Sequence, residues 1–216
     1  MTALYPSLIA ADQLNLQQAV LLLQDQCNGF HCDVMDNHFV PNLTWGPPTI
    51  GSLNALSSKP LWVHLMVDNP YQILDALELK PDSLISFHLE STNEAGRVID
   101  RIREKKWRPS LAISPKTQPE STFDLLPAID QVLVMSVEPG AGGQLFLPDA
   151  LGKIKKLVSR RTELGLNFTI GVDGGITAQN IAAVCQAGGQ DLVVGTAVFG
   201  SDDPVTSLAH LYEQCQ

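Results

Sequence analysis

The sequence contains few basic residues, and they are confined to its middle. Against 23 Asp and Glu there are 14 Lys and Arg, which gives a net charge of −9. All 14 lie between Lys59 and Arg161, so the last quarter of the chain has neither Lys nor Arg. This balance argues against nucleic acid or an anionic membrane surface as a partner. An anion bound by the last quarter must be held by backbone N–H groups, helix N-termini or residues from elsewhere.

Closely spaced cysteines and long apolar runs are also missing. No two of the four cysteines have the C-x-x-C spacing of a metal or redox motif: Cys27, Cys32, Cys185 and Cys215. A chain of 216 residues with 44% apolar residues can bury a core without disulfides, so we expect reduced thiols. The apolar run at 19–23 is too short to span a membrane, and the N-terminus lacks the basic start of a secretory signal. We therefore expect a cytoplasmic protein whose residues 1–216 form one domain.

Short apolar segments alternate with longer helix-like segments along the whole chain. Helices are expected over 13–26, with Asp12 as N-cap, over 49–56, 91–106 and 147–164, and over 177–187, with Thr177 as N-cap. Further helices are expected over 69–79 and 203–216, and a short one over 120–126. The predicted strands cover 5–10, 30–35, 61–67, 83–87, 110–113, 131–136, 168–172 and 191–195. Eight such units predict an α/β fold, a closed (β/α)8 TIM barrel, because mostly apolar strands without strict alternation are typical of parallel sheets covered on both faces. An open doubly wound sheet is the alternative, although even spacing leaves no obvious edge strand.

Two imidazoles and two carboxylates are expected to meet at the mouth of this barrel. His31 and Asp33 share one face of a strand because they are two residues apart, and we expect them to close that strand, as His64 and Asp173 close two others. Reacting groups of such barrels lie at the carboxyl ends of the strands. The set therefore predicts a site for one divalent metal ion, in which Asp33 also moves a proton. A hydrogen-bonded core histidine is the alternative for any single His, and the ligand types do not choose among Zn, Fe, Mn and Co.

Methionines and glycines are placed near the same ends of the strands. Met35, Met66 and Met135 are predicted to form an apolar wall around the reacting atoms, although flexible core filling is the alternative for any one of them. Glycine-rich loops follow the sixth, seventh and eighth predicted strands: Gly140, Ala141, Gly142 and Gly143; Gly174 and Gly175; Gly195 and Thr196. Loops after the seventh and eighth strands commonly bind phosphate in such barrels, which predicts a phosphate site made by backbone donors. A single Gly-Gly pair would be weak support, since turns use it freely.

Six segments of the sequence resemble the ribulose-phosphate 3-epimerase family. Residues 31–44, His-Cys-Asp-Val-Met-Asp-Asn-His-Phe-Val-Pro-Asn-Leu-Thr, carry the most specific likeness. The others are Pro-Ser-Leu-Ile-Ala-Ala-Asp (6–12), Val-His-Leu-Met-Val (63–67), Ser-Phe-His-Leu-Glu (86–90), Met-Ser-Val-Glu-Pro-Gly-Ala-Gly-Gly-Gln (135–144) and Val-Asp-Gly-Gly-Ile (172–176). They follow one another in the family's order, so the resemblance covers nearly the whole chain.

The resemblance implies a function and a role for each matching residue. Members of the family are metal-dependent barrels, homodimers or hexamers, that interconvert D-ribulose 5-phosphate and D-xylulose 5-phosphate at C3. Asp33 would accept a proton, Asp173 would donate one from the opposite face, and Ser7 and His64 would contact the sugar. The metal ligands would be His31, Asp33, His64 and Asp173. The substrate, mostly its phosphate end, would be held by Gly140, Ala141, Gly142, Gly143, Gly174, Gly175, Gly195 and Thr196.

Departures from the family pattern and rival functions are few. Ala141 stands where the family usually has Phe, and Lys116, where a small residue is usual, is either a phosphate ligand or an exposed charge. His88 and Glu90 are expected to hydrogen-bond the metal ligands rather than bind the metal. A 3-epimerase of a six-carbon ketose phosphate is the nearest rival. A Schiff-base aldolase is disfavoured because no predicted strand contains Lys, and a sugar-phosphate or metal-binding sensor without turnover would be expected to lack Asp33 or Asp173.

Overall fold

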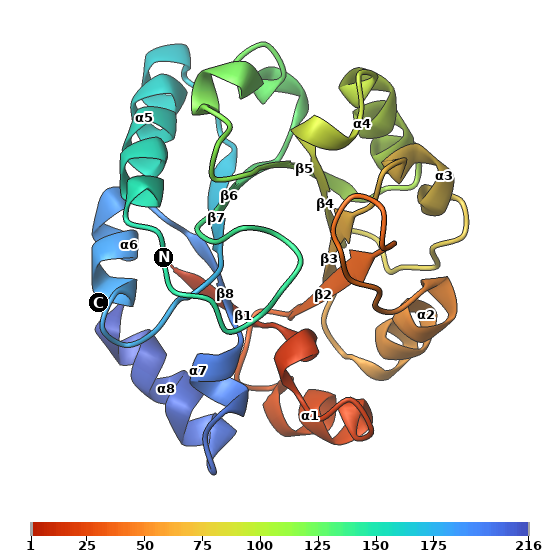
Figure 1. Cartoon of the computed structure of the whole chain (residues 1–216), viewed down its shortest axis with the longest axis vertical. Coiled ribbons are helices and arrows are strands. Elements are labelled where there is room, and N and C mark those ends of the chain that lie inside the picture. The colour runs from red at the N-terminus through yellow and green to blue at the C-terminus, as the bar shows by residue number, and fades with distance from the viewer. Residues whose placement is uncertain (1, 216) are drawn as a thin grey trace.

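Eight parallel strands arranged around a central axis form the framework of the computed structural model, which describes residues 2–215 (Figure 1). From β2 to β8 each strand pairs with the next in sequence, and β1 pairs with β8. Within the described chain, β1 and β2 are joined by a single bridge between Ser7 and His31, so the barrel is nearly closed. The predicted single-domain (β/α)8 barrel is confirmed, and the open doubly wound sheet is wrong. The strands are β1 (Ala3–Pro6), β2 (Phe30–Met35), β3 (Leu61–Met66), β4 (Leu84–His88), β5 (Arg108–Ile113), β6 (Gln131–Met135), β7 (Thr169–Asp173) and β8 (Asp191–Val194).

Helices surround this ring of strands on the outside (Figure 1). They are α1 (Leu16–Leu23), α2 (Pro47–Leu56), α3 (Pro70–Leu74), α4 (Ala95–Glu104), α5 (Asp149–Leu164), α6 (Ile181–Ala187), α7 (Thr196–Phe199) and α8 (Pro204–Gln214). Short 3-10 helices cover Leu8–Ala10, Leu89–Ser91, Pro119–Thr122 and Leu126–Ala128. Within residues 2–215, no helix combines the length and the apolar character that crossing a membrane requires.

Several predicted boundaries are wrong because local hydrogen bonds end or delay the elements. The first strand ends at Pro6, since Leu8–Ala10 is a 3-10 turn. Helix α1 begins only at Leu16, because the Asp12 carboxylate accepts from the Leu14 N–H in a turn ahead of it. Helix α6 begins at Ile181 rather than after Thr177, and two 3-10 turns replace the helix expected over 120–126. Residues 1 and 216 of the predicted domain lie outside the described residues.

A chain of buried polar groups crosses the barrel interior below the mouth. The Trp62 indole N–H donates to Ser86 Oγ, which donates to Ser110 Oγ, each over 2.7 Å. Ser110 donates to Gln131 Oε1 over 2.7 Å, and the Gln131 amide donates to Asp191 over 2.8 Å. Trp62, Ser86, Ser110 and Gln131 are all fully buried. Each polar group in this series has its hydrogen-bond partner. The series therefore stabilises a defined core instead of leaving orphaned polar atoms.

We expect Ser110→Ala to lower the free energy of unfolding by about 1–3 kcal/mol, because the Ser86 hydroxyl loses its acceptor and Gln131 Oε1 loses its donor. Urea denaturation of the two proteins measures the difference. Ser52→Ala is the matched control, since Ser52 is exposed and its hydroxyl donates to Pro48 within α2. Equal stability of the two variants would contradict the importance of the buried chain.

Candidate active site

The strand register brings the predicted metal ligands together inside the barrel. Asp33 on β2 is the register partner of His64 on β3, and Asp173 is the last residue of β7. His31 is only the second residue of β2. It lies beside Ser7, the residue that follows β1, because the strands are staggered around the ring. The expectation that His31, Asp33 and His64 close their strands is therefore wrong. They lie deeper than the strand ends, which are occupied by Met35 and Met66.

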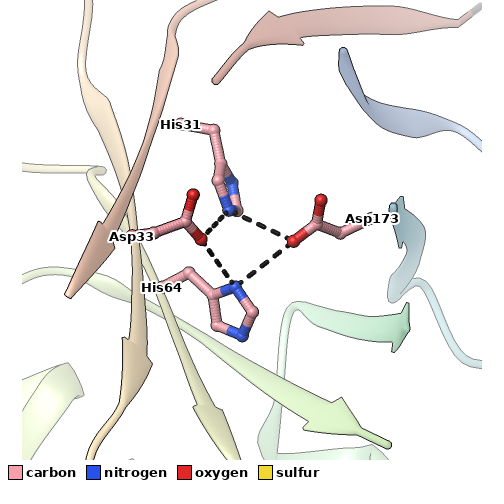
Figure 2. A group of neighbouring side chains, drawn as sticks. All are labelled: His31, Asp33, His64 and Asp173. Atoms are coloured by element: carbon pink, nitrogen blue, oxygen red, sulfur yellow. Dashed lines mark hydrogen bonds and ion pairs between the residues drawn. The ribbon is translucent and has the colours of Figure 1, made fainter. Parts of the chain in front are cut away.

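The four side chains form a compact ring (Figure 2). His31 Nε2 lies 3.1 Å from Asp33 Oδ1 and 3.5 Å from Asp173 Oδ2. His64 Nδ1 lies 3.3 Å from the same Asp33 oxygen and 3.4 Å from the same Asp173 oxygen. All four candidate ligand atoms are within 4.8 Å of one another, so each could reach one central cation.

Burial and charge act against each other in this ring. Burial disfavours the imidazolium, but the carboxylates of Asp33 and Asp173 outweigh it and raise the pKa of His31 to about 10. The same carboxylates raise the pKa of His64, again against burial. Burial disfavours the carboxylates too, yet His31 and His64 hold the pKa of Asp33 and of Asp173 below the usual range. Both carboxylates are therefore ionised at neutral pH, ready to act as anionic ligands.

One nitrogen of the ring fits a metal ion better than it fits the protein. His64 Nδ1 is buried and has no hydrogen-bond partner within the described chain, although two carboxylate oxygens lie near it. Such an orphaned atom is unfavourable unless something else satisfies it. Two imidazole nitrogens and two carboxylate oxygens are a donor set suited to Zn, Fe, Mn or Co, so these residues fit a divalent cation.

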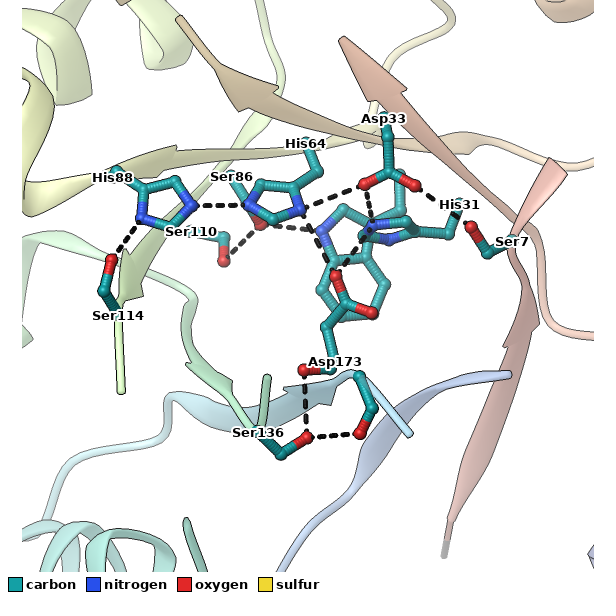
Figure 3. A network of polar contacts seen from close by, with 12 residues as sticks. Ser7, His31, Asp33, His64, Ser86, His88, Ser110, Ser114, Ser136 and Asp173 are labelled. Atoms are coloured by element: carbon teal, nitrogen blue, oxygen red, sulfur yellow. Dashed lines mark hydrogen bonds and ion pairs between the residues drawn. The ribbon is translucent and has the colours of Figure 1, made fainter. Parts of the chain in front are cut away.

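Each carboxylate keeps one oxygen outside the ring (Figure 2). Asp33 Oδ2 accepts a hydrogen bond from the Ser7 hydroxyl over 3.0 Å, as Figure 3 shows. Only 7% of the Asp33 side chain and 15% of the Asp173 side chain are exposed to solvent. One oxygen of each residue could thus bind a cation while the other exchanges a proton with a bound molecule.

A cavity of about 600 Å³ opens above the ring. Asp33 and Asp173 line it, whereas His31 and His64 are fully buried beneath it. The other predicted site residues all lie in its lining: Ser7, Met35, Met66, Met135, Gly140, Ala141, Gly142, Gly143, Gly174, Gly175, Gly195 and Thr196. The volume is within the ordinary range for pockets that bind small molecules.

Comparison with known proteins now gives the family. Residues 3–199 match the sequence model of the family described as "Ribulose-phosphate 3 epimerase family". The chain belongs to the ribulose-phosphate 3-epimerase family. The resemblance seen in the sequence is confirmed, and the chain is an enzyme of the epimerase, and so isomerase, class.

Relatives from distant organisms match over nearly their whole length. A protein of Mycobacterium tuberculosis named ribulose-phosphate 3-epimerase is 38% identical over 210 residues, covering 97% of this chain and 91% of its own. The proteins of the same name from Treponema pallidum (37% over 197 residues, covering 91% of this chain and 90% of that protein) and Schizosaccharomyces pombe (38% over 210 residues, covering 95% and 90%) are similar to it as well.

Solved structures with other names and low sequence identity share the fold. KGPDC from Streptococcus mutans has a TM-score of 0.69 at 13% identity, covering 100% of this chain and 97% of that one. A 3-hexulose-6-phosphate synthase has a TM-score of 0.69 at 14% identity, with 100% of both chains covered. At these identities the likeness shows only the barrel fold.

Glycine is required at two positions of the loop after β7 in this family member. Gly174 has φ +117°, and a Cβ there would lie 2.3 Å from a Val137 methyl group. Gly175 has φ +64°, and its Cβ would lie 2.5 Å from the backbone nitrogen of Phe146. Only glycine adopts these conformations at such close approach without strain. The loops after β6 and β7 are therefore packed backbone against backbone beside the cavity.

Two polar residues that hold this loop were not predicted as part of the site. Ser136 Oγ contacts the carbonyl oxygens of Asp173 and Gly174 at 2.9 and 2.6 Å (Figure 3). Asn180 accepts from the Thr177 N–H and donates to the Gly175 carbonyl. This bridge makes a turn before α6, so Thr177 is not its N-cap. The position of Ser136 at the end of a strand was the only sign of its role, and nothing local pointed to Asn180.

Lys116 lies outside the cavity lining. Its side chain is 88% exposed, and its ammonium lies 3.5 Å from a carboxylate oxygen of Glu138. No Lys or Arg lines the cavity among residues 2–215, so the ring of ligands and the glycine loops surround it without a cationic side chain.

Proposed function

We propose that this family member interconverts D-ribulose 5-phosphate and D-xylulose 5-phosphate by inverting C3. The observation that carries the proposal is the pair of ionised, nearly buried carboxylates, Asp33 and Asp173, on different strands beside one cavity. Inverting a carbon next to a ketone requires that a proton leave one face and another return to the opposite face. Two carboxylates beside one cavity supply such an acid–base pair.

Asp33 would remove the C3 proton, and Asp173 would return one from the other side. Asp33 Oδ2, the oxygen outside the ring, is the proposed acceptor, and the Ser7 hydroxyl that donates to it would orient it and contact the sugar. In the reverse reaction the two carboxylates exchange roles. The enediolate between the two steps carries negative charge on the oxygens of C2 and C3.

His31 Nε2, His64 Nδ1, Asp33 Oδ1 and Asp173 Oδ2 would hold one divalent metal ion. When bound, such an ion supplies positive charge that stabilises the enediolate oxygens. The chain's own contribution is to fix the four ligand atoms from three strands before substrate arrives.

The glycine loops would hold the phosphate end of the substrate. With no cationic side chain in the described cavity lining, the donors would be backbone N–H groups around Gly140–Gly143, Gly174 and Gly175, and Gly195 and Thr196. The close packing of Gly175 against the backbone of Phe146 and Gln144 supports this role, because it fixes the loops after β6 and β7, and so their backbone donors, against each other beside the cavity.

The methionines would keep water away from the intermediate. Met35, Met66 and Met135 line the cavity and are at most 4% exposed. Their apolar side chains lie above the ligand ring at the ends of β2, β3 and β6. Excluding water protects a reactive enediolate from unwanted protonation.

Removal of the metal is the direct test. We expect the purified protein to form D-xylulose 5-phosphate from D-ribulose 5-phosphate, and to lose more than about 100-fold of this rate after exhaustive chelation, because a metal supplies several kcal/mol of charge stabilisation. A coupled assay follows the rate, and circular dichroism shows whether the barrel is still folded. Recovery on adding Zn²⁺, Mn²⁺, Co²⁺ or Fe²⁺ in separate samples identifies the active ions. Full activity in protein shown to be free of metal would refute the metal role.

A six-carbon ketose phosphate is a second candidate substrate. The loop after β6 passes over the mouth of the barrel (Figure 1), and its exposed segment Ala141–Gly143 carries no side chain larger than a methyl group. The cavity is therefore not closed by a bulky residue at this point. Competing D-ribulose 5-phosphate against D-allulose 6-phosphate in one turnover assay separates the two.

We also expect the protein to form a homo-oligomer and to act in the cytoplasm. Leu14, Leu21 and Leu22 are 93%, 49% and 46% exposed, and α1, which holds two of them, has no charged residue. Such a surface suits contact with a second copy of a chain whose net charge is −9. The four free thiols suit a reducing compartment. Sedimentation velocity gives the mass of the assembly.

A further inference from the structure

The nitrogen of His64 that faces away from the ligand ring meets a second histidine. His64 Nε2 lies 3.0 Å from His88 Nε2 (Figure 3), and both side chains are fully buried. The two rings are nearly parallel and meet edge to edge, with centroids 5.1 Å apart and planes at 21° (Figure 3). A contact this short between two ring nitrogens requires that one donate a proton and the other accept it.

A carboxylate lies at the far side of His88. His88 Nδ1 is 3.3 Å from Glu90 Oε2 and 3.3 Å from the Ser114 hydroxyl. The other carboxylate oxygen of Glu90 accepts from the Ser114 N–H over 2.8 Å and from the Thr117 hydroxyl. Burial disfavours the charge, but the bonds from His88, Thr117 and Ser114 hold the pKa of Glu90 at about 2, so Glu90 is ionised at neutral pH.

When both rings are neutral, these contacts allow one arrangement of protons. An ionised carboxylate only accepts, so His88 Nδ1 must carry the proton. A neutral imidazole has one N–H, so with its proton on Nδ1 toward Glu90 the His88 ring has a lone pair at Nε2, which is an acceptor. His64 Nε2 must then be the donor, and a neutral His64 has no proton on Nδ1. In this neutral form, the form that can bind a cation, the Nδ1 lone pair faces the oxygens of Asp33 and Asp173, where a cation would lie.

We propose that Glu90, acting through His88, is a positioning residue that fixes the His64 tautomer able to bind the metal. This inference rests on the metal site of the proposed function and adds a determinant of its affinity. The His31 ligand has no equivalent support. Its Nδ1 lacks a hydrogen-bond partner within the described chain, and its ring packs against the Trp62 ring in a T shape with centroids 4.8 Å apart. Control of tautomer by the protein is thus concentrated on the His64 side.

A buried lysine fixes the loop whose residues donate hydrogen bonds to Glu90. The Lys153 side chain from α5 donates to the backbone carbonyls of Ser114 (3.0 Å), Pro115 (2.6 Å) and Thr117 (2.6 Å), and Lys153 is only 6% exposed. These bonds fix the loop after β5, whose Ser114 and Thr117 donate to Glu90. The carboxylate is therefore oriented by groups that do not touch the cavity.

The test replaces the carboxylate by an amide. Glu90→Gln keeps the shape of the side chain but replaces one carboxylate oxygen by an NH₂ group. An NH₂ turned toward His88 would donate to its Nδ1, so His88 Nε2 would have to donate to His64 Nε2, the reverse of the direction in the unmodified protein. The proton of His64 would then lie on Nδ1 and block the metal. We expect the affinity of the metal-free protein for Zn²⁺, titrated against a chelating indicator, to fall about 10- to 100-fold.

Two further variants separate this effect from simpler ones. Glu94→Gln makes the same chemical change at a side chain that is 67% exposed and pairs with Arg97 on the surface, so Zn²⁺ affinity should not change. Thr117→Val removes one loop hydrogen bond to Glu90 Oε1 but leaves Oε2 facing His88. Its affinity should fall much less than that of Glu90→Gln.

Nitrogen-15 NMR of histidine-labelled protein reads the tautomers directly, with and without Zn²⁺. We expect His88 protonated at Nδ1 in the unmodified protein, and His64 protonated at Nε2 in the Zn²⁺ form. His88 protonated at Nε2, equal Zn²⁺ affinity of the Glu90→Gln and Glu94→Gln variants, or a loss in Thr117→Val as large as in Glu90→Gln would each overturn the inference. If the unmodified protein binds no divalent cation, the metal part of the proposed function fails, while the proton on His88 still decides the inference.

Discussion

Replacing Asp173 with Asn is expected to lower the rate of epimerisation about 10²- to 10⁴-fold, because the amide cannot return a proton to C3. The barrel should remain folded, since asparagine has nearly the same shape and Ser136 bonds to the backbone of Asp173 rather than to its carboxylate. A coupled assay for D-xylulose 5-phosphate measures the loss. An unchanged rate would show that Asp173 is not the donor.

Proton exchange separates loss of the acid from general damage. In D₂O, the Asp173→Asn variant should still incorporate deuterium at C3 of D-ribulose 5-phosphate, because Asp33 can remove and return a proton on its own face. Asp33→Asn should show the reverse, with exchange only from D-xylulose 5-phosphate. Metal content must be measured in both variants, since each replaced residue is also a proposed ligand. A variant that keeps its metal but loses exchange from both substrates would contradict the assignment of one carboxylate to each face.

The affinity of the site for a metal ion is expected to depend strongly on pH. In the empty site the two carboxylates raise the pKa of His31 to about 10, so at neutral pH a proton occupies the His31 nitrogen that the metal needs, and they also raise the pKa of His64, so a proton competes more strongly for that ring as well. A raised pKa means that the proton competes more strongly and is lost only as pH rises. The apparent affinity for Zn²⁺ should therefore increase about tenfold per pH unit for each proton displaced, from pH 6 to pH 8.

Calorimetry in two buffers with different ionisation enthalpies counts the protons released on Zn²⁺ binding. We expect between one and two protons at pH 7. The Asp carboxylates add nothing in this range, because the pKa of each is lowered and they are already ionised. An affinity that does not vary between pH 6 and pH 8 would mean that both imidazoles are neutral in the empty site.

The sequence predicted the barrel fold, and which candidate residues lie together, better than it predicted how deep in the barrel each residue lies. Spacing alone placed His31 and Asp33 on one face of a strand, and all six residues of β2 proved buried. The depth of His31 could not be inferred in this way, because it depends on the stagger that sets His31 beside Ser7. Stagger is a property of the closed ring and of no single strand.

Local signals failed where a side chain had more than one possible partner. Asp12 has the residue type of an N-cap, but it bonds to Leu14 and Asn15 in a turn before α1. Asn180 bonds to the backbone of the glycine loop after β7, a contact that depends on how that loop folds against α6. Short polar side chains compete for nearby backbone groups in this way, so residue type alone misplaced the starts of α1 and α6.

The single bridge between Ser7 and His31 gives the ring of strands a seam at its active site. Elsewhere in the ring, neighbouring strands are paired along runs of three or more residues, whereas β1 and β2 meet through this bridge in the part of the chain described. Separation of β1 from β2 therefore disrupts the shortest run of strand pairing in the described ring, and amide hydrogen exchange should be fastest there among the strands. His31 lies at this seam, on β2, and Asp173 lies across the barrel on β7. A cation bound by both residues would therefore resist the separation of the strands at the seam. It raises the free energy of opening by mass action, so occupancy of the site and closure of the barrel become one linked equilibrium.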